Sequence, residues 1–154
     1  MKYFFWPDLL VILLSIVALT AIAMMINNIF QSREWYSIIL SALGIVILLF
    51  FALRVPYCVK VTESSIKVQS VIGSKKFEKK KIRIELITKK DLSNSYRVFG
   101  NGGFGGYVGR FHSPKLGNFK MMIVRQSDMV KITELDTGEI YIINYPKQLL
   151  QESK

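Results

Sequence analysis

The chain has 154 residues, of which 51% are hydrophobic, and its formal net charge at pH 7 is +10. This length suits one domain of ordinary size, or one small domain with a membrane anchor. The single cysteine, Cys58, excludes an intrachain disulfide framework and a CxxC metal pair.

Two apolar segments without charged residues dominate the first third of the chain, at residues 9–26 and 35–53. As helices they would each be about 27–29 Å long, close to the ~30 Å hydrocarbon core of a bilayer. Both are apolar on all sides, whereas a helix of a water-soluble protein is apolar along one stripe. We therefore expect residues 1–54 to form a transmembrane helical hairpin, with helices at about 8–27 and 34–54. A pair of buried core helices and a signal peptide cleaved near residues 21–23 are the alternatives.

Charged and aromatic residues near the ends of these segments predict the orientation of the hairpin. Lys2 precedes the first segment, and Arg54 and Lys60 follow the second, whereas the short loop between the segments has no net charge. Positively charged flanks stay in the cytoplasm, so both termini and the C-terminal domain of a multi-pass protein are expected there. Trp6 and Trp35 lie where aromatic belts would meet the two membrane surfaces. Neither segment has an ionisable residue, which argues against a transport pathway.

Residues 55–154 change to short alternating runs, which predict a β domain. Six or seven antiparallel strands, followed by a short helix at residues 147–153, suggest a small barrel or an orthogonal sandwich. Residues 91–118 have the composition of a loop. The expected strands cover residues 57–62, 66–71, 75–78, 82–87, 119–125, 129–135 and 139–144.

This domain carries most of the charge, because all but two of the 21 Lys and Arg residues lie within residues 54–154. A basic domain tethered beside an anionic leaflet is attracted to it, so the densest basic cluster is a candidate lipid-facing surface. Lysines at a hairpin tip also keep a sheet edge from pairing with other chains. No helix-turn-helix, zinc finger or RNA-binding strand motif accompanies the cluster, so nucleic acid is not an expected partner. The basic cluster comprises Lys75, Lys76, Lys79, Lys80, Lys81 and Arg83.

A glycine-rich loop is expected at residues 96–118. Gly100, Gly102 and Gly105 match the pattern GxGxxG, but further glycines and a proline follow, where a dinucleotide site requires a helix. The aromatic rings of this loop are expected either in the core or against the helical hairpin, or else at the lipid interface with arginines reaching phosphates. Binding of a partner protein is the third possibility. The candidate contact residues are Arg97, Phe99, Phe104, Tyr107, Arg110 and Phe111.

The stretch from Arg97 to Phe111 resembles the glycine-rich segment of the bacterial PH-domain-like (pleckstrin-homology-like) membrane proteins, a family of uncharacterised function. The layout is similar too: two helices, a strand at 57–62, and a strand at 139–144 with a helix after it. The resemblance covers about residues 57–150. It implies a barrel of two near-orthogonal sheets capped by a C-terminal helix, in a protein of the bacterial cytoplasmic (inner) membrane. It carries over no catalytic residues and no headgroup pocket.

Nothing in the sequence forms a recognisable catalytic or metal site. His112 is the only histidine, and no paired carboxylates accompany it. We therefore expect no enzyme activity, cofactor, metal or small-molecule substrate. The preferred hypothesis is a membrane-anchored binding or assembly module that contacts anionic phospholipid headgroups, a partner protein or its own copies. The alternatives are a structural subunit of a larger membrane complex, packed through Ser41, Ala42 and Gly44, and an uncharacterised enzyme or transport component.

Overall fold

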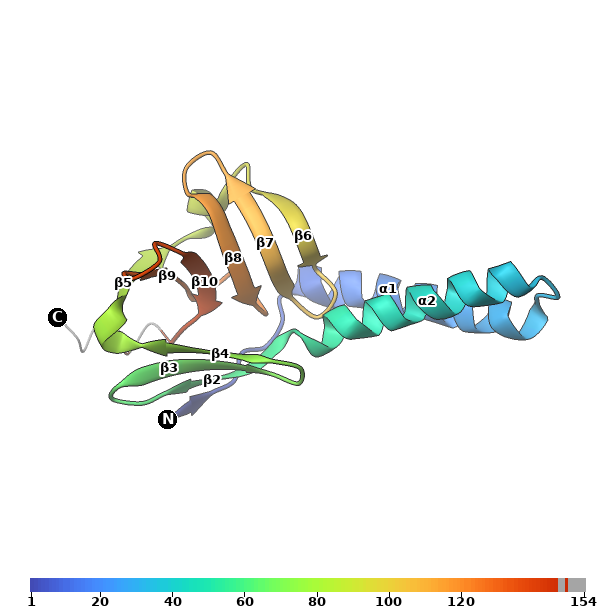
Figure 1. Ribbon diagram of the computed structural model, residues 1–154, viewed down its shortest axis with the longest axis horizontal. Coiled ribbons are helices and arrows are strands. Elements are labelled where there is room, and N and C mark those ends of the chain that lie inside the picture. Colours follow the sequence, from blue (N-terminus) through green and yellow to red (C-terminus); the bar gives the residue numbers. More distant parts are fainter. Residues whose placement is uncertain (147–148, 150–154) are drawn as a thin grey trace.

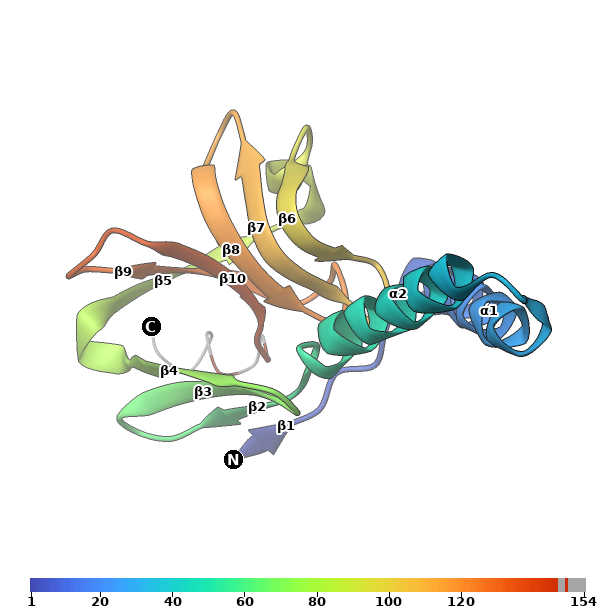
Figure 2. The ribbon, with the colours of Figure 1, turned by 45° about the vertical axis from the view of Figure 1, so that its right-hand side comes forward.

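The computed structural model describes residues 1–146 and 149, and it shows a helical hairpin projecting from a β domain (Figure 1). Helices α1 (Leu9–Gln31) and α2 (Trp35–Leu53) lie side by side and leave the β domain in the same direction (Figure 2). Both are long and apolar enough to cross a membrane. Only 6% of the most apolar window of each helix is buried, so the β domain does not cover them.

Local sequence explains where the two helices begin and end. Asp8, after Pro7, is the N-cap residue of α1 and has an extended backbone, with φ −68° and ψ 159°. α2 ends at Leu53, shortly before Pro56, because a proline disfavours helical conformation in the residue that precedes it. Residues 32–34 form the short connection between the helices.

Small residues allow the two helices to pack closely. Ser41 is only 7% exposed, and a Cβ added at Gly44 would lie 3.1 Å from the side chain of Met25 in α1. Ala42 between them is exposed. Two of the three small residues considered for docking another membrane protein therefore serve the hairpin's own packing.

Within residues 1–146, the β domain has ten strands in two sheets. The first sheet has the strand order β1-β2-β3-β4, and the second has the order β5-β9-β10-β8-β7-β6. The 3-10 helices η1 (Lys79–Lys81) and η2 (Lys89–Leu92) flank β5. The strands are β1 (Lys2–Tyr3), β2 (Pro56–Val61), β3 (Ser65–Ser70), β4 (Ser74–Glu78), β5 (Ile82–Ile87), β6 (Tyr96–Gly102), β7 (Tyr107–Ser113), β8 (Gly117–Ile123), β9 (Met129–Glu134) and β10 (Ile140–Asn144).

The structure corrects the expected set of six or seven antiparallel strands in number and in one pairing. β8 and β10 are parallel, with Met121 opposite Ile142. β9 forms an antiparallel hairpin with β10 and pairs with β5 on its other side, so β10 enters the sheet between β8 and β9. Alternation along the chain predicts strands and hairpins, but it does not show which strand is inserted between two others.

Residues 91–118, predicted as a loop, instead form η2, β6 and β7 and lead into β8. Gly100 and Gly109 face each other across β6 and β7 with φ values of 123° and 145°. A Cβ at Gly109 would lie 2.1 Å from the carbonyl oxygen of Phe99, so the strands approach each other here only because the residue is glycine. Glycine usually weakens a strand, which explains why the pattern indicated a loop.

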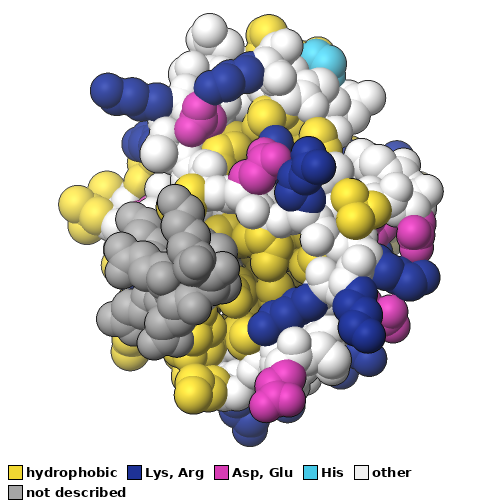
Figure 3. Space-filling model, turned by 90° about the vertical axis from the view of Figure 1, so that its left-hand side faces the viewer, with side chains coloured by type: hydrophobic (Ala, Val, Ile, Leu, Met, Phe, Trp, Pro, Cys, Tyr) yellow, Lys and Arg dark blue, Asp and Glu magenta, His cyan; other side chains and the backbone are white. Residues whose placement is uncertain are grey.

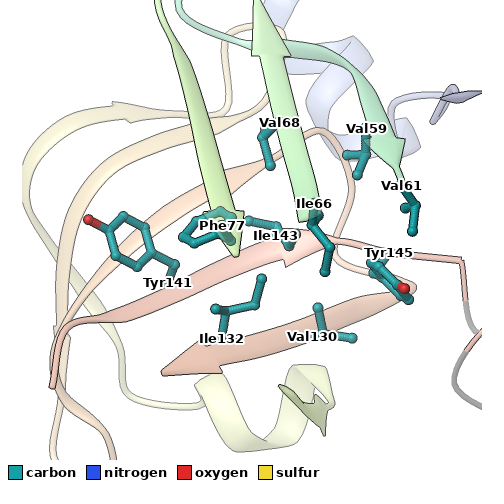
Figure 4. Packing of buried hydrophobic residues seen from close by; sticks show 10 residues of the cluster. All are labelled: Val59, Val61, Ile66, Val68, Phe77, Val130, Ile132, Tyr141, Ile143 and Tyr145. Atoms are coloured by element: carbon teal, nitrogen blue, oxygen red, sulfur yellow. The ribbon is translucent and has the colours of Figure 1, made fainter. Parts of the chain in front are cut away.

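Two hydrophobic clusters lie on opposite faces of β10. Tyr141 and Ile143 point towards the first sheet and meet Phe77 of β4 (Figure 4). Ile142 belongs to the other cluster, which also includes Val11 of α1. β10 is therefore buried on both faces, and its apolar run is continuous for that reason. The cluster between the sheets comprises Val59, Val61, Ile66, Val68, Phe77, Val130, Ile132, Tyr141, Ile143 and Tyr145.

The N-terminal segment, residues 1–8, joins the hairpin to the β domain. From the sequence, residues 1–54 were assigned to the hairpin alone. β1 pairs with β2, and the amino group of Met1 donates to the Val61 carbonyl oxygen at 2.7 Å. The Asp8 carboxylate accepts from the Gln126 backbone N–H at 2.6 Å. The predicted helix at residues 147–153 falls on positions that, apart from Leu149, lie outside the described residues.

Candidate functional site

A groove of about 520 Å³ lies between the two sheets, beside the end of α2. The β3–β4 hairpin forms one wall, strands β6 to β8 form the other, and Phe51 and Arg54 border it at the base of the helices. The Ile72 backbone N–H donates to the Leu53 carbonyl oxygen at 2.9 Å, which holds the β3–β4 turn against α2. The rings of Phe99 and Phe51 meet edge-on with centroids 5.9 Å apart. The groove therefore combines aromatic surface with the base of α2. The hairpin leaves the β domain at this point (Figure 1).

Two lysine–glutamate pairs surround the ring of Tyr141 on the floor of the groove. Lys75 Nζ lies 4.7 Å from the ring centroid and 2.9 Å from Glu134 Oε1. Lys120 Nζ lies 5.1 Å from the centroid and 2.7 Å from Glu139 Oε2. Lys120 also donates to the Tyr141 hydroxyl oxygen at 3.2 Å, and that hydroxyl donates to Glu139. Both lysines of the groove therefore already have a carboxylate partner.

These hydrogen bonds keep Lys75, Lys120 and Glu139 in their charged forms. The hydrogen bond to Glu139 raises the pKa of Lys120, and the same bond lowers the pKa of Glu139. Burial lowers the pKa of Lys75, but its hydrogen bonds to Glu134 and Tyr141 outweigh this effect, and the net shift is upwards. Groups shifted in these directions stay ionised at neutral pH, whereas a general acid or base needs a pKa near the working pH.

Two arginines of the groove differ from the lysines. In the part of the chain that the structure describes, neither Arg54 nor Arg110 forms an ion pair with a carboxylate. The Arg54 guanidinium lies over the ring of Phe50, 4.6 Å from its centroid, and both arginine side chains are exposed. The groove therefore has a surplus of two positive charges.

Strand alternation separates the candidate residues of the glycine-rich segment. Arg110 of β7 lines the groove, and so does Phe99 of β6, which is 63% exposed. Tyr107 and Phe111 point to the other side of β7, where they are 8% and 7% exposed in the second hydrophobic cluster. Arg97 is exposed on β6. The structure thus brings Phe99 and Arg110 together and places Tyr107 and Phe111 in the core.

The turn between β6 and β7 rests on the base of α1. The hydroxyl oxygen of Ser15 accepts from the Gly105 backbone N–H at 2.9 Å and donates to the Val11 carbonyl oxygen at 2.7 Å. The side chain of Asn101 accepts from the Phe104 N–H at 3.0 Å and donates to the Phe104 carbonyl oxygen. Phe104, a candidate contact residue, is half-buried in this turn. The turn is therefore a contact between the β domain and the hairpin.

The residues of the basic cluster do not form one surface. Lys75 lines the groove, whereas η1, which holds three of the lysines, lies at the end of the domain opposite the helices (Figure 1 and Figure 2). Lys81 pairs with Asp136 at 3.0 Å. Figure 3 views that end of the molecule, where basic and acidic side chains are interspersed. Lys76 and Arg83 are exposed on β4 and β5.

The remaining chemistry-bearing side chains have structural partners. His112 Nδ1 lies 2.8 Å from Asn118 Oδ1, and Cys58 is 2% exposed on β2. Among residues 1–146 and 149, no group of three His, Cys, Asp or Glu side chains could hold a metal ion.

Sequence reasoning missed Lys120 and Tyr141 as site residues and used Arg54 only to orient the hairpin. The alternation in β8 and β10 does show that Lys120 shares a face with Met122, and Tyr141 with Ile143. The missing information is which strands stand opposite these faces, because the groove is formed by segments that lie far apart in the chain.

Comparison with protein families matches residues 57–148 to the family described as Bacterial PH domain. No curated protein and no solved structure matches the chain. The matched region covers more than half of the chain and includes all strands from β3 to β10 and most of β2. The chain therefore belongs to the bacterial PH domain family, and it carries two apolar helices ahead of that domain.

Proposed function

We propose that the protein is a non-catalytic binding module of the bacterial cytoplasmic membrane, whose hairpin holds the PH domain at the cytoplasmic face, where the domain contacts anionic lipid. The exposure of the two helices carries this proposal. Leu9 is 72% exposed and Leu40 is 70% exposed, and large apolar side chains are exposed along both helices. Apolar surface on this scale is unfavourable in water, and a bilayer would supply apolar surroundings.

The ends of the hairpin support this placement. Trp6 near the base and Trp35 at the far end are 82% and 71% exposed, and tryptophan favours the membrane–water interface. α1 has 23 residues and is about 35 Å long, enough to cross the hydrocarbon core. Val71 in the β3–β4 turn is 69% exposed beside the base of the helices, where the membrane surface would begin.

The same placement decides which basic residues would meet lipid. Arg54 is the C-cap residue of α2, so the groove would lie at the level of the headgroups. Attraction to an anionic leaflet is about 1 kcal/mol per basic residue near the surface and fades within a Debye length of about 8 Å. The lysines of η1 lie at the far end of the domain, so we assign the lipid contact to the groove side.

The charged groups of the groove support a binding role over a catalytic one. Lys75 and Lys120 are paired with Glu134 and Glu139, and the pKa of each lysine is raised. A lysine whose pKa is raised in this way stays protonated at neutral pH and is not poised to transfer a proton.

Cysteine labelling tests the anchoring and the orientation. Because native Cys58 is buried, an introduced cysteine would be the reactive thiol of the folded protein. Ser32→Cys places a thiol between the helices, and Lys80→Cys places one in η1. In spheroplasts, a membrane-impermeant maleimide should label Ser32→Cys, and it should label Lys80→Cys only after lysis. Labelling of Lys80→Cys before lysis, or extraction of the protein from membranes by alkaline carbonate, would refute the proposal.

The intact mass of the purified protein tests the signal-peptide alternative. Cleavage near residues 21–23 would remove β1 and Val11 of α1, which is fully buried against the β domain. We expect the uncleaved mass, and a product shortened at that position would contradict the two-helix anchor.

A further inference from the structure

We infer that the groove beside α2 binds one anionic phospholipid of the adjoining leaflet, with Arg54 and Arg110 holding its phosphate and Phe51 and Phe99 contacting the start of its acyl chains. The inference rests on the proposed function, because it needs the base of α2 to lie at the membrane surface. It names the ligand class and the residues that would select it.

Charge complementarity identifies the ligand as an anion. Four cationic side chains line the groove, and two of them, Lys75 and Lys120, are neutralised by glutamates. Arg54 and Arg110 have no carboxylate partner among residues 1–146 and 149. A guanidinium is always charged, and its planar set of donors matches the oxygens of a phosphate. The surplus of two positive charges therefore suits one phosphate group, and the paired lysines add no further net charge.

Ser70 adds a neutral polar group to the same groove. Its hydroxyl oxygen is buried, and no described residue gives it a hydrogen-bond partner. Buried hydroxyls nearly always have a partner, so an orphan that lines a groove with unpaired arginines points to a polar ligand. The hydroxyl can donate to a phosphate oxygen or to a carbonyl oxygen of an ester.

The apolar lining selects a lipid over a soluble phosphate. Phe99 is 63% exposed, and its edge-on contact with Phe51 continues the groove onto α2. Ile72 and Met121 add further apolar surface to the groove. A soluble phosphate would leave these side chains in water, whereas a phospholipid places its phosphate beside the arginines and its acyl chains along the helix. The volume of about 520 Å³ is that of an ordinary small-molecule site, so it suits one headgroup with the first part of its chains.

Native mass spectrometry of the full chain in mild detergent tests this inference. Phosphatidylglycerol is the probe, and phosphatidylcholine is the neutral reference. The wild type should bind one phosphatidylglycerol in preference to phosphatidylcholine. Arg54→Gln and Arg110→Gln should each weaken this binding about tenfold, equivalent to about 1.4 kcal/mol. Arg83→Gln removes the same charge from an exposed position on β5 outside the groove, and it should leave the affinity unchanged within about twofold.

Protection of Cys58 from a thiol reagent confirms that each variant is folded before its affinity is compared. Equal weakening by all three substitutions would indicate a diffuse electrostatic attraction instead of a binding site in the groove, and it would overturn the inference. Unchanged binding in Arg54→Gln and Arg110→Gln would also overturn it, and so would displacement of the bound lipid by glycerol 3-phosphate. A wild type without preference for phosphatidylglycerol would instead refute the lipid contact of the proposed function itself. The two failures are therefore distinguishable.

Discussion

Substitution of Gly109 by alanine should destabilise the wall of the groove strongly. Gly109 has a φ of 145°, and a Cβ would lie 2.1 Å from the Phe99 carbonyl oxygen and 2.8 Å from Gly100 Cα, both of them backbone atoms. The strained backbone costs about 1–3 kcal/mol for a residue with a side chain. Forced separation of β6 and β7 adds about 1–3 kcal/mol. We therefore expect Gly109→Ala to lower the free energy of unfolding by about 4 kcal/mol.

Gly117→Ala is the matched control for the steric part. Gly117 also has a positive φ, 69°, but no atom lies within 4 Å of the place of a Cβ. This variant should lose about 1 kcal/mol through backbone strain alone. Modification of buried Cys58 during heating in detergent reports unfolding of the β domain. At about 4–8 °C per kcal/mol, the midpoint of Gly109→Ala should lie more than about 10 °C below that of the control. Equal midpoints would refute the argument that the close approach of β6 and β7 requires glycine.

Three further predictions concern contacts that hold the domain together. Asn144→Asp should lower the free energy of unfolding by about 3 kcal/mol, measured by the same Cys58 assay. Asn144 Nδ2 donates to the carbonyl oxygens of Arg125 at 2.9 Å and Ser127 at 2.8 Å, and a carboxylate would repel both. Wild-type stability in this variant would contradict the prediction. Ser15→Ala should cost about 1 kcal/mol and speed hydrogen exchange at the Gly105 amide, and unchanged exchange would show that the turn does not depend on this bond. The hydrogen bond from Lys115, with those from Thr88, lowers the pKa of Asp91 below that of the unfolded chain, so its stabilisation is present at neutral pH and is lost as the pH falls. Asp91→Asn should therefore lower the thermal midpoint at neutral pH, and its difference from the wild type should begin to shrink below about pH 4 and shrink further as the pH falls, whereas a constant difference would exclude this linkage.

Much of the fold follows from local patterns in the sequence. The strand at Ile82–Ile87 has the bounds that its alternation predicted, and the apolar segments at 9–26 and 35–53 lie within α1 and α2. The strands around Gly100 and Gly109 were missed because they depend on glycines that let two backbones approach closely, and a stretch rich in glycine has the composition of a loop. β1 was missed because two residues show no period, and only its pairing with β2 makes it a strand.

The candidate site was less accessible to sequence reasoning for a related reason. Arg110 and Phe99 were predicted as candidate contact residues because they lie in an unusual segment. Their neighbours in the groove, Arg54 and Tyr141, lie in ordinary surroundings and come close only through the fold. The dense run of lysines drew attention by its composition, yet most of that run lies at the end of the domain away from the helices.

A lipid site in the groove, as proposed, would include residues outside the matched PH domain. Phe51 belongs to α2 and Arg54 is its C-cap residue, and the β6–β7 turn is held by Ser15 of α1. A fragment of residues 55–154 would lack Phe51 and Arg54, and it would also lack β1 and the buried Val11. Such a fragment should therefore lose selective binding of phosphatidylglycerol even where its first cluster, between the sheets, still folds. Retention of full affinity by the fragment would show that the lipid contact lies elsewhere on the domain. If a folded fragment loses the affinity, the hairpin supplies part of the site in addition to anchoring it.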